Sequence, residues 1–411
     1  MELKGKYNSA KIFTDNVEFS CMDQIKSLLD CRAFEGSKIR IMSDCHAGKG
    51  CVIGYTQTIT DKVVANLVGV DLNCGMTYVK IPEIDVRTLD KVIHEHIPSG
   101  MEIHKPGKLP SKLTRKVEDL ISGLHTKLNP KTVARVLNSV GTLGGGNHFL
   151  EVAKSKETGQ WYLVIHTGSR NLGLQVCNYW QDIAEKIIQG NKTSIDKVIK
   201  ELKKQGRESE IEETVRNMKA ENKDIPKELS YLEGENMEGY LHDVAIASKY
   251  ADLNRKTIAE IILGKMGILS KKSELKTTCH NYIDLGRKII RKGAISANAD
   301  EEVLIPMNMR DGSLLCVGKG NPDWNYSAPH GAGRIMSRGQ AKKLVSMEEF
   351  RESMKGIYTT SVSEATLDES PMVYKSASEI ESLIGDTVEI REHLIPIYNF
   401  KAGEEASWQK K

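Results

Sequence analysis

The feature of this sequence that most constrains its fold is a series of short glycine-rich stretches that carry histidine, cysteine or aspartate beside predicted strand ends. Five of these side chains are candidate metal ligands, and they are far apart along the chain: Asp71, Cys74, His148, His166 and His280. They can act together only if the fold brings several strand ends to one place. We therefore expect an α+β or mixed α/β fold, with mixed sheets flanked by helices and the site among loops at strand ends.

Two of the stretches follow a clear strand pattern. Residues 38–42 alternate in the manner of a strand and run into Asp44. Residues 161–165 form a second strand pattern, which ends in His166 and Arg170. A site for metal and phosphate and a simple turn both fit these patterns.

An apolar run at residues 63–70 predicts a buried strand that leads into Asp71 and Cys74. These two residues are close enough in sequence to bind one metal ion. A thiolate beside a carboxylate suits a borderline divalent metal such as manganese, iron or zinc. An Asx turn with a buried cysteine is the alternative.

Residues 141–151 contain three consecutive glycines, whose backbone N–H groups can cradle an anion. In the same stretch Asn147 offers a donor, His148 a possible metal ligand and Glu151 an acceptor. A structural role for this histidine is the alternative.

Residues 327–338 set His330 in a run of small residues that lets a ligand approach the backbone closely. Arg334 and Arg338 follow at helical spacing. A nucleophilic imidazole, a glycine-lined pocket and two guanidinium groups suit phosphoryl or nucleotidyl chemistry. The alternative is a glycine-rich turn entering a helix, with a histidine that only packs.

The five candidate ligands would serve two metal ions if the Cys74 thiolate bridged them. Two close cations stabilise the attacking and leaving oxygens in phosphoryl transfer. Coincidence explains one such site easily, but it explains all five poorly.

Helical patterns occupy residues 85–137 and 240–263. Residues 185–235 mix both signs of charge, which is typical of a solvated helical face, so we expect a polar lobe or insertion there. We expect residues 1–411 to form a single catalytic domain with a loose tail at residues 404–411.

Composition narrows the functional classes. The net charge of +3 means that any site for a polyanion must be local. The eight cysteines include no CxxC pair, and the N-terminus has no signal-like apolar region, which favours a reduced cytoplasmic compartment. No apolar run is long enough to suggest a membrane span, and a monomer is the simplest expectation.

With these residues in view, the chain resembles the RtcB family of RNA ligases. The similarity extends from about residue 38 to Lys401, and its motifs occur in the family's order at residues 44–50, 69–76, 141–151, 166–170, 280–282, 291–294 and 327–338. The resemblance implies a ligase that joins an RNA 3′-phosphate or 2′,3′-cyclic phosphate to a 5′-hydroxyl, in RNA repair or tRNA splicing. It also implies GTP and two Mn(II) ions as cofactors and RNA with such broken ends as the partner.

The resemblance further implies a role for each matching residue. Asp71, Cys74, His148, His166 and His280 would bind the two manganese ions. His330 would attack the GTP α-phosphate and carry GMP, with Asp44 assisting catalysis. Arg170 and Arg338 would hold RNA phosphates. The guanylate would contact Asn147, His148, Phe149, Leu150, Glu151, His280, Asn281, Pro306, Met307, Asn308, Met309, Ser313, His330, Gly331, Ala332, Gly333, Tyr374 and Lys401.

The chain departs from the family's pattern at several positions, so we interpret it as a divergent bacterial-type member. The family commonly has Pro-Gly-Ser-Met-Gly where residues 306–310 read Pro-Met-Asn-Met-Arg. Asn308 therefore replaces a small hydroxyl, and Arg310 adds a charge, which makes the nucleotide preference an open question. Cys45 and Ala47 are also atypical. The Lys-x-Asp-Gly motif of ordinary nucleotidyltransferases is missing, which favours a histidine as the covalent residue.

Two other functions fit parts of the sequence. A dinuclear manganese phosphoesterase would keep the metal ligands but lose nucleotide transfer, as the altered loop at residues 306–310 would permit. A catalytically silent RNA-binding protein would not need a complete ligand set or His330. The completeness of these motifs favours the ligase.

Overall fold

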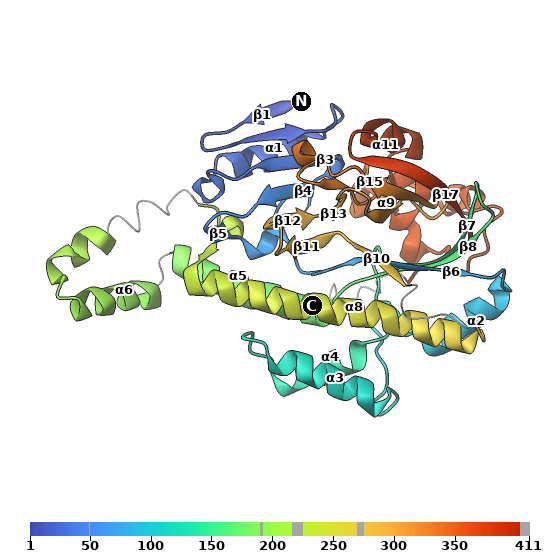
Figure 1. Cartoon of the computed structure of the whole chain (residues 1–411), viewed down its shortest axis with the longest axis horizontal. Helices are drawn as coiled ribbons and strands as arrows, with labels where there is room; N and C mark the ends of the chain where they lie inside the picture. The colour runs from blue at the N-terminus through green and yellow to red at the C-terminus, as the bar shows by residue number, and fades with distance from the viewer. Residues whose placement is uncertain (49, 190–191, 216–224, 269–274, 403–411) are drawn as a thin grey trace.

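The computed structural model describes residues 1–48, 50–189, 192–215, 225–268 and 275–402. It contains two large β-sheets, with the long helix α8 (Gly234–Lys265) running beneath both of them (Figure 1). Helix α8 contacts strands of both sheets as well as helices on its other sides. The architecture is α+β, as the sequence predicted.

The first sheet has six strands. Its neighbours pair antiparallel except for the parallel pair β2 and β3. In spatial order the strands are β1 (Glu2–Lys4), β2 (Ser9–Ile12), β3 (Ile39–His46), β4 (Ile53–Thr58), β12 (Ile289–Lys292) and β11 (Asn281–Asp284).

The second sheet has seven strands, and all of them pair antiparallel. In spatial order they are β10 (Lys276–Cys279), β6 (Gly75–Ile81), β8 (Trp161–Thr167), β7 (Phe149–Ser155), β17 (Val388–Phe400), β15 (Ser313–Gly318) and β14 (Glu302–Pro306). Two further short pairs join β13 (Ala294–Ser296) to β16 (Ser327–Pro329), and β5 (Lys62–Val63) to β9 (Leu232–Glu233).

Some of the helices pack against the two sheets, and others pack against α8 or other helical segments. Besides α8 they are α1 (Phe19–Leu29), α2 (Val86–His96), α3 (Ser111–Ser122), α4 (Pro130–Ser139), α5 (Arg170–Ile188), α6 (Lys192–Lys204), α9 (Arg338–Leu344), α10 (Met347–Ser353) and α11 (Ala377–Ile384). Local signals explain their starts. Asn129 caps α4 ahead of a proline at its first position, and Ser337 forms a capping box with Gln340 at α9.

The apolar side chains of α8 divide between two hydrophobic clusters. Near its C-terminal end, Ile258 and Ile262 pack with Ile165 of β8 in the core beneath the second sheet. Nearer its N-terminal end, Val244 packs in a cluster that includes Val176 of α5. Burial on several sides explains why the helix forms over such a length.

Two polar residues in the middle of α8 hold the loops at the strand ends. Oδ1 of Asn254 accepts from the backbone N–H groups of Gly141 and Thr142 at 2.7 and 3.1 Å, and its Nδ2 donates to the carbonyl of Gly168 at 3.1 Å. The buried guanidinium of the next residue, Arg255, donates to the carbonyls of Asn73 and Thr167 at 2.7 and 3.0 Å. Helix α8 therefore ties together the loops that carry the candidate metal ligands.

Most of the predicted elements are present. Strands occupy residues 38–42 and 161–165 almost as expected, and the helical region predicted at residues 85–137 forms three helices, the last of which ends at Ser139. The predicted strand at residues 63–70 is wrong. Only Lys62–Val63 pairs, because its partner β9 is equally short, and the chain then turns through a 3-10 helix at Ala65–Leu67.

Other predictions concern the outline of the chain. Helix α6, within the predicted polar lobe, lies away from the two sheets (Figure 1). The predicted tail at residues 404–411 falls outside the described residues, and the single catalytic domain stays a prediction. Across the described ranges, no helix combines the length and the apolar character that crossing a membrane requires.

The role of Asn254 predicts a large loss of stability on truncation. Asn254→Ala leaves several buried backbone groups without partners, which should lower the free energy of unfolding by about 3 kcal/mol. Urea unfolding followed by circular dichroism measures this change. Lys249→Ala, at an exposed position of the same helix, is the control and should change stability little. Equal stability of the two variants would contradict the role of Asn254.

Candidate active site

The turn that carries Asp71 and Cys74 lies directly before β6. The backbone N–H of Cys74 donates to the carbonyl of Asp71 at 3.1 Å, and Asn73 between them has a φ of 54°. Asparagine adopts this left-handed conformation more readily than most residues do. The local sequence thus favours a turn that brings the two side chains to one place.

The three histidines reach the same place from different strands. His148 precedes β7, and His166 lies in β8 between Met76 and Phe149 of the neighbouring strands. His280 links β10 of the second sheet to β11 of the first, and its backbone N–H donates to the carbonyl of Cys74 at 2.9 Å. The site therefore forms where the two sheets meet.

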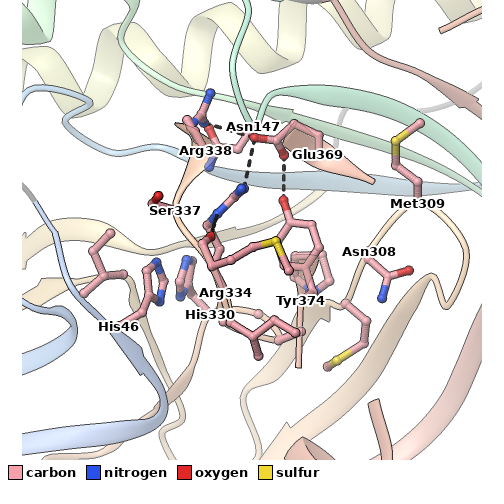
Figure 2. A pocket seen from close by; sticks show the side chains of 18 of the residues that line it. His46, Asn147, Asn308, Met309, His330, Arg334, Ser337, Arg338, Glu369 and Tyr374 are labelled. Atoms are coloured by element: carbon pink, nitrogen blue, oxygen red, sulfur yellow. Dashed lines mark hydrogen bonds and ion pairs between the residues drawn. The ribbon is translucent and has the colours of Figure 1, made fainter. Parts of the chain in front are cut away.

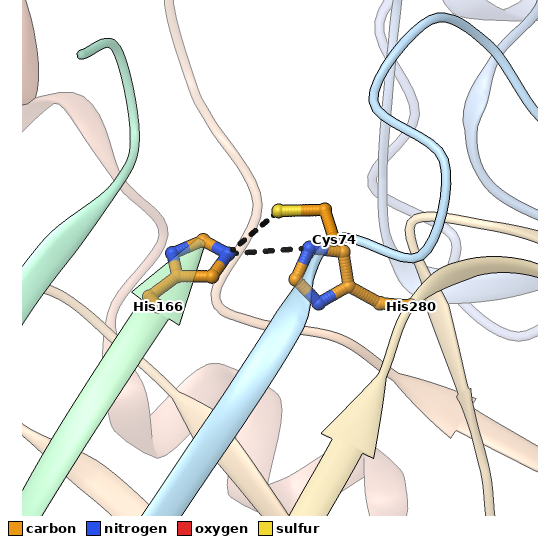
Figure 3. A group of neighbouring side chains, drawn as sticks. All are labelled: Cys74, His166 and His280. Carbon is orange, nitrogen blue, oxygen red and sulfur yellow. Dashed lines mark hydrogen bonds between the residues drawn. The ribbon is translucent and has the colours of Figure 1, made fainter. Parts of the chain in front are cut away.

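The five predicted metal ligands converge, and Figure 3 shows three of them. Sγ of Cys74 lies 3.4 Å from Nε2 of His148 and 3.3 Å from Nε2 of His166. Nε2 of His166 lies 3.3 Å from Nε2 of His280, and Nε2 of His148 lies 2.9 Å from Oδ2 of Asp71. Side chains separated by up to 209 positions in the sequence thus form one cluster, which is buried except for the half-buried Asp71.

Backbone carbonyls orient two of the histidine rings toward the centre of the cluster. Nδ1 of His148 lies 2.9 Å from the carbonyl of Leu143, and Nδ1 of His166 lies 3.0 Å from the carbonyl of Asn147. Because a carbonyl can only accept, each Nδ1 carries a proton, and the Nε2 of each ring points into the cluster, where it can serve as a metal ligand. A cation among these donors would satisfy them, and the carbonyl partners orient the rings as metal ligands require.

The buried surroundings set the protonation of the cluster. Burial and the neighbouring imidazoles lower the pKa values of His166 and His280 well below the usual range, so both rings are neutral. Although burial opposes it, His148 lowers the pKa of Asp71 to about 2. Burial and the Asp71 carboxylate raise the pKa of the Cys74 thiol, so a thiolate there requires a cation beside it.

The donors divide into two groups that share Cys74. One group adds Asp71 and His148, and the other adds His166 and His280, with the ligand atoms of each group within 4.8 Å of one another. A metal ion about 2.0–2.3 Å from each donor fits such spacing. Thiolate, imidazole and carboxylate together suit a borderline divalent ion. The residues therefore fit the predicted pair of ions with a bridging thiolate, while the identity of the metal stays a prediction.

His330 lies beside the ligand cluster, directly after β16. Its ring centroid is 5.0 Å from that of His280. Its Nδ1 lies 2.7 Å from Oδ2 of the buried Asp44, and its backbone N–H donates to the same oxygen at 3.2 Å. The carboxylate therefore holds the proton on Nδ1, which leaves Nε2 of His330 with a lone pair, as a nucleophile needs.

The close approach of the His330 loop to Asp44 of β3 depends on Gly333. Its φ is +74°, and a Cβ atom there would lie 2.3 Å from the carbonyl oxygen of Asp44. A larger residue would therefore push the His330 loop away from Asp44.

His46 is a residue at the site that we did not predict from the sequence. Figure 2 shows its ring beside that of His330. Its Nδ1 lies 3.0 Å from the carbonyl of Asp44, and burial lowers its pKa to about 4, so the ring is neutral. The available signal was its position in a strand two residues after Asp44, which places both side chains on one face.

A cavity of about 900 Å³ opens beside His330 and His280 (Figure 2). Its volume suits a nucleotide. The predicted guanylate contacts that line it are Asn147, Phe149, Glu151, His280, Pro306, Met307, Asn308, Met309, His330, Gly331, Ala332, Gly333, Tyr374 and Lys401.

Four other predicted contacts lie elsewhere among the described residues. Along β7 alternate side chains face opposite ways, so Leu150 packs in the hydrophobic core while its neighbours line the cavity. His148 belongs to the ligand cluster. Oδ1 of Asn281 accepts from the backbone of Gly293 at 2.8 Å, and Ser313 is buried in β15.

Glu151, Asn399 and Lys401 lie together on the cavity wall. Oε2 of Glu151 accepts from Nδ2 of Asn399 at 3.1 Å, whereas its Oε1 has no partner in the part of the chain that the structure describes. Burial raises the pKa of Glu151 to about 8, although Asn399 and Lys401 oppose this shift. A buried carboxyl oxygen without a donor, on the wall of a cavity, suits a ligand that supplies N–H groups.

Glu369 is a second residue that we did not predict. It lines the cavity and accepts from Lys401 Nζ at 2.7 Å and from the Tyr374 hydroxyl at 2.6 Å. Although burial opposes it, the charges of Lys401, Arg338 and Arg334 lower its pKa to about 2. Its position five residues before Tyr374 gave little indication of this network.

The predicted RNA-binding arginines occupy different surroundings. Arg338 is partly exposed at the start of α9, beside the cavity. Arg170 packs behind the ligand cluster, where it donates to Thr142 and to the carbonyl of Gly100, both at 3.3 Å. Helix α9 begins at Arg338, after the Ser337 cap, so Arg334 precedes the helix and the two arginines do not share one helical face.

The atypical loop at residues 306–310 has its own local explanation. Oδ1 of Asn308 accepts from the backbone N–H groups of Arg310 and Asp311 at 3.0 and 2.9 Å, and its Nδ2 donates to Asp311 at 2.8 Å. The asparagine therefore forms an Asx turn, with its polar groups used within the loop. Arg310 pairs with Asp311 at 2.7 Å.

Comparisons with known proteins agree on one family. A family model described as "tRNA-splicing ligase RtcB" matches residues 27–402. The chain is 30% identical over 390 residues to the RNA-splicing ligase RtcB of Escherichia coli K12, covering 86% of this chain and 87% of that protein. It is 26% identical over 472 residues to the tRNA-splicing ligase RtcB of Aeropyrum pernix, covering 90% of each. It is 24% identical over 475 residues to that of Methanococcus maripaludis, covering 94% and 92%.

The shared position of Cys74 predicts that both ions depend on it. Cys74→Ala removes the one thiol that both ligand groups share. After dialysis against manganese, the purified variant should therefore hold much less bound divalent metal than the wild type. Elemental analysis measures the metal content. Cys316→Ala, which removes another buried thiol, is the control and should bind metal as the wild type does. Full metal content in Cys74→Ala would contradict a bridging role.

The surroundings of Glu151 predict a pH-dependent stability. Its pKa is about 8 in the folded protein, whereas an unfolded glutamate has a pKa of about 4.3. Between these values only the folded state holds the proton, so this group makes the wild type less stable as the pH rises. Glu151→Gln cannot titrate, and its stability relative to the wild type should therefore increase from about pH 5 to pH 8.

Urea unfolding of the nucleotide-free proteins at several pH values measures this difference. Glu260→Gln, at an exposed position of α8, is the control and should show no such trend. A constant difference between Glu151→Gln and the wild type would contradict a raised pKa.

Proposed function

The chain belongs to the RtcB family of RNA ligases, and we propose that it joins an RNA 3′-phosphate or 2′,3′-cyclic phosphate to a 5′-hydroxyl, with GTP and manganese as cofactors. The observation that carries this proposal is the position of His330. Its ring lies beside His280 of the ligand cluster and lines a cavity that can hold a nucleotide, while Asp44 fixes its Nδ1. RNA repair or tRNA splicing is the proposed context.

In the first step Nε2 of His330 would attack the α-phosphate of GTP. A phosphorus–nitrogen bond forms, pyrophosphate leaves, and the imidazole gains positive charge. Asp44 would stabilise this charge through the hydrogen bond at Nδ1, as a carboxylate partner does for other catalytic histidines. The product is a GMP–histidine phosphoramidate.

The cavity wall suits the edge of a guanine base. Guanine presents an acceptor, O6, next to the donors N1–H and N2–H. We assign the unpartnered Oε1 of Glu151 to these donors and the ammonium of Lys401 to the acceptor. Binding of guanine would thus supply the hydrogen bonds that Glu151 lacks. Adenine presents the opposite pattern at these positions, so the wall favours GTP over ATP.

The ligand cluster would hold manganese through Asp71, Cys74, His148, His166 and His280. Bound divalent ions would withdraw charge from the phosphate oxygens during transfer. The chain's own contribution is to orient the imidazoles of His148 and His166 through carbonyl partners and to hold His280 next to His330.

In the second step an oxygen of the RNA 3′-phosphate would attack the phosphorus of the guanylate. The bond to His330 breaks and a phosphoanhydride forms. The RNA 5′-hydroxyl then attacks the activated RNA phosphate, expels GMP and completes the phosphodiester. The exposed guanidinium of Arg338, on the cavity wall, is placed to hold an RNA phosphate in these steps.

Self-labelling with GTP tests the nucleophile. Incubation with manganese and GTP labelled at the α-phosphate should give acid-labile, alkali-stable label on the wild-type protein and none on His330→Ala. His242→Ala, which removes an exposed histidine of α8, is the control and should label normally. Label that survives His330→Ala would exclude this histidine as the nucleophile.

A sealing assay separates the ligase from other proteins that keep the metal ligands. The labelled wild type should join RNA fragments with 3′-phosphate and 5′-hydroxyl ends. Hydrolysis of RNA phosphates without labelling would support the dinuclear phosphoesterase instead, and absence of both activities would support an RNA-binding protein.

A further inference from the structure

We propose that Glu369 is a positioning residue that links the guanine-binding side of the cavity to the arginines on its RNA-binding side. This inference rests on the proposed ligase function, in which Lys401 and Tyr374 serve the nucleotide and Arg338 serves the RNA. It adds a role for a carboxylate that takes no part in the chemical steps described above.

The two oxygens of Glu369 face different partners. Oε2 accepts from Nζ of Lys401 at 2.7 Å and from the hydroxyl of Tyr374 at 2.6 Å. Oε1 forms an ion pair with Arg338 at 3.1 Å and accepts from Arg334 at 3.5 Å. Figure 2 shows the carboxyl group of Glu369 between Tyr374 and the arginines. One side chain therefore holds both sets of ligand-binding groups.

Burial makes this arrangement energetically important. The side chains of Glu369 and Lys401 are only 3% and 5% exposed, whereas that of Arg338 is 42% exposed. A buried charge is stable only when it is paired, and here one carboxylate serves three cations. Without it, Lys401 and the two guanidinium groups would repel one another at close range.

The charged groups around Glu369 can still bind anionic and polar ligands. Four cations (Lys401, Arg334, Arg338 and Lys342) surround two carboxylates (Glu369 and Asp368), which leaves an excess of positive charge, and an ammonium group can donate three hydrogen bonds. Lys401 can thus remain paired with Glu369 and still donate to a base. Arg338, at the exposed edge, can likewise remain paired and bind an RNA phosphate.

The neighbouring chain reinforces the link. Arg334 also donates to the carbonyl of Asp368 at 2.6 Å, and its guanidinium lies 5.3 Å from the ring centroid of Tyr374. Movement of Tyr374 on the nucleotide side would therefore shift the arginines, and movement of the arginines would shift Tyr374. Groups that share partners in this way are expected to act non-additively.

The adjacent residue Asp368 offers a matched control. It is an equally buried carboxylate, but its side chain pairs with Arg338 at 3.3 Å and with Lys342 at 3.8 Å. Within the described residues, Lys401 and Tyr374 bind the carboxylate of Glu369 and not that of Asp368. Asp368→Asn should therefore disturb only the arginine side, whereas Glu369→Gln should disturb both sides.

The experiment measures two half-saturating concentrations for each full-length variant. The first is that of GTP for self-labelling, and the second is that of 3′-phosphate RNA when it is mixed with protein already carrying GMP. For Glu369→Gln we expect both to increase by about tenfold or more, the size of a lost charge-assisted hydrogen bond. For Asp368→Asn we expect the RNA value to increase and the GTP value to stay near that of the wild type.

The outcomes separate the inference from the function on which it rests. An increase in only one value for Glu369→Gln, or in neither, would overturn the linking role while the wild type still labels and seals. Failure of the wild type to label would instead overturn the proposed function. A general loss of structure is recognised by thermal melting of each variant.

If Glu369→Gln melts far below the wild type, Tyr374→Phe decides the question. This variant keeps the ring and removes only the hydroxyl that donates to Glu369. Because this change is on the nucleotide side, an increase in the half-saturating RNA concentration would support the link. An unchanged RNA value would overturn it.

Discussion

The active site depends on the convergence of five possible metal-binding side chains around the Cys74 thiol. Three imidazole nitrogens, a carboxylate and this sulfur lie at contact distance, an arrangement of donors that suits a cation. Holding these donors together requires rigid support from outside the cluster. Asn254 and Arg255 of α8 provide it by binding the backbone of the loops that carry the ligands, and β10 and β11 provide it by joining the two sheets at His280.

Three buried carboxyl groups around the cavity show how surroundings decide the role of one chemical group. Asp44 accepts from His330 and fixes the tautomer of its ring. Glu369 is surrounded by three cations, which lower its pKa to about 2 and keep it ionised. Glu151 has only one hydrogen-bond donor among the described residues, and burial raises its pKa to about 8. The surroundings of Asp44 suit the partner of a nucleophile, and those of Glu369 suit a positioning group. The surroundings of Glu151 suit a group that accepts hydrogen bonds from a ligand.

Sequence patterns predicted the parts of the site that lie in dense local motifs. The ligands beside glycines and His330 among small residues are each recognisable within a few positions, and the structure brings all six together. The patterns failed where a residue acts through distant partners. Glu369 and Asn399 lie in ordinary surroundings in the sequence and acquire their roles from Lys401 and Glu151. The predicted strand at residues 63–70 failed for a related reason, because pairing depends on a partner strand that turned out to be two residues long.

By itself, then, the sequence determined which groups are available to this protein: imidazoles, a thiol, carboxylates and glycines that permit close approach. It also determined the local turns and helix caps, since these depend on neighbouring residues. Only the tertiary structure decided which carboxylate partners which cation, which side chains of β7 face the cavity, and that Cys74 lies within both ligand groups. Those outcomes depend on distances between segments far apart in the chain, which local sequence does not encode.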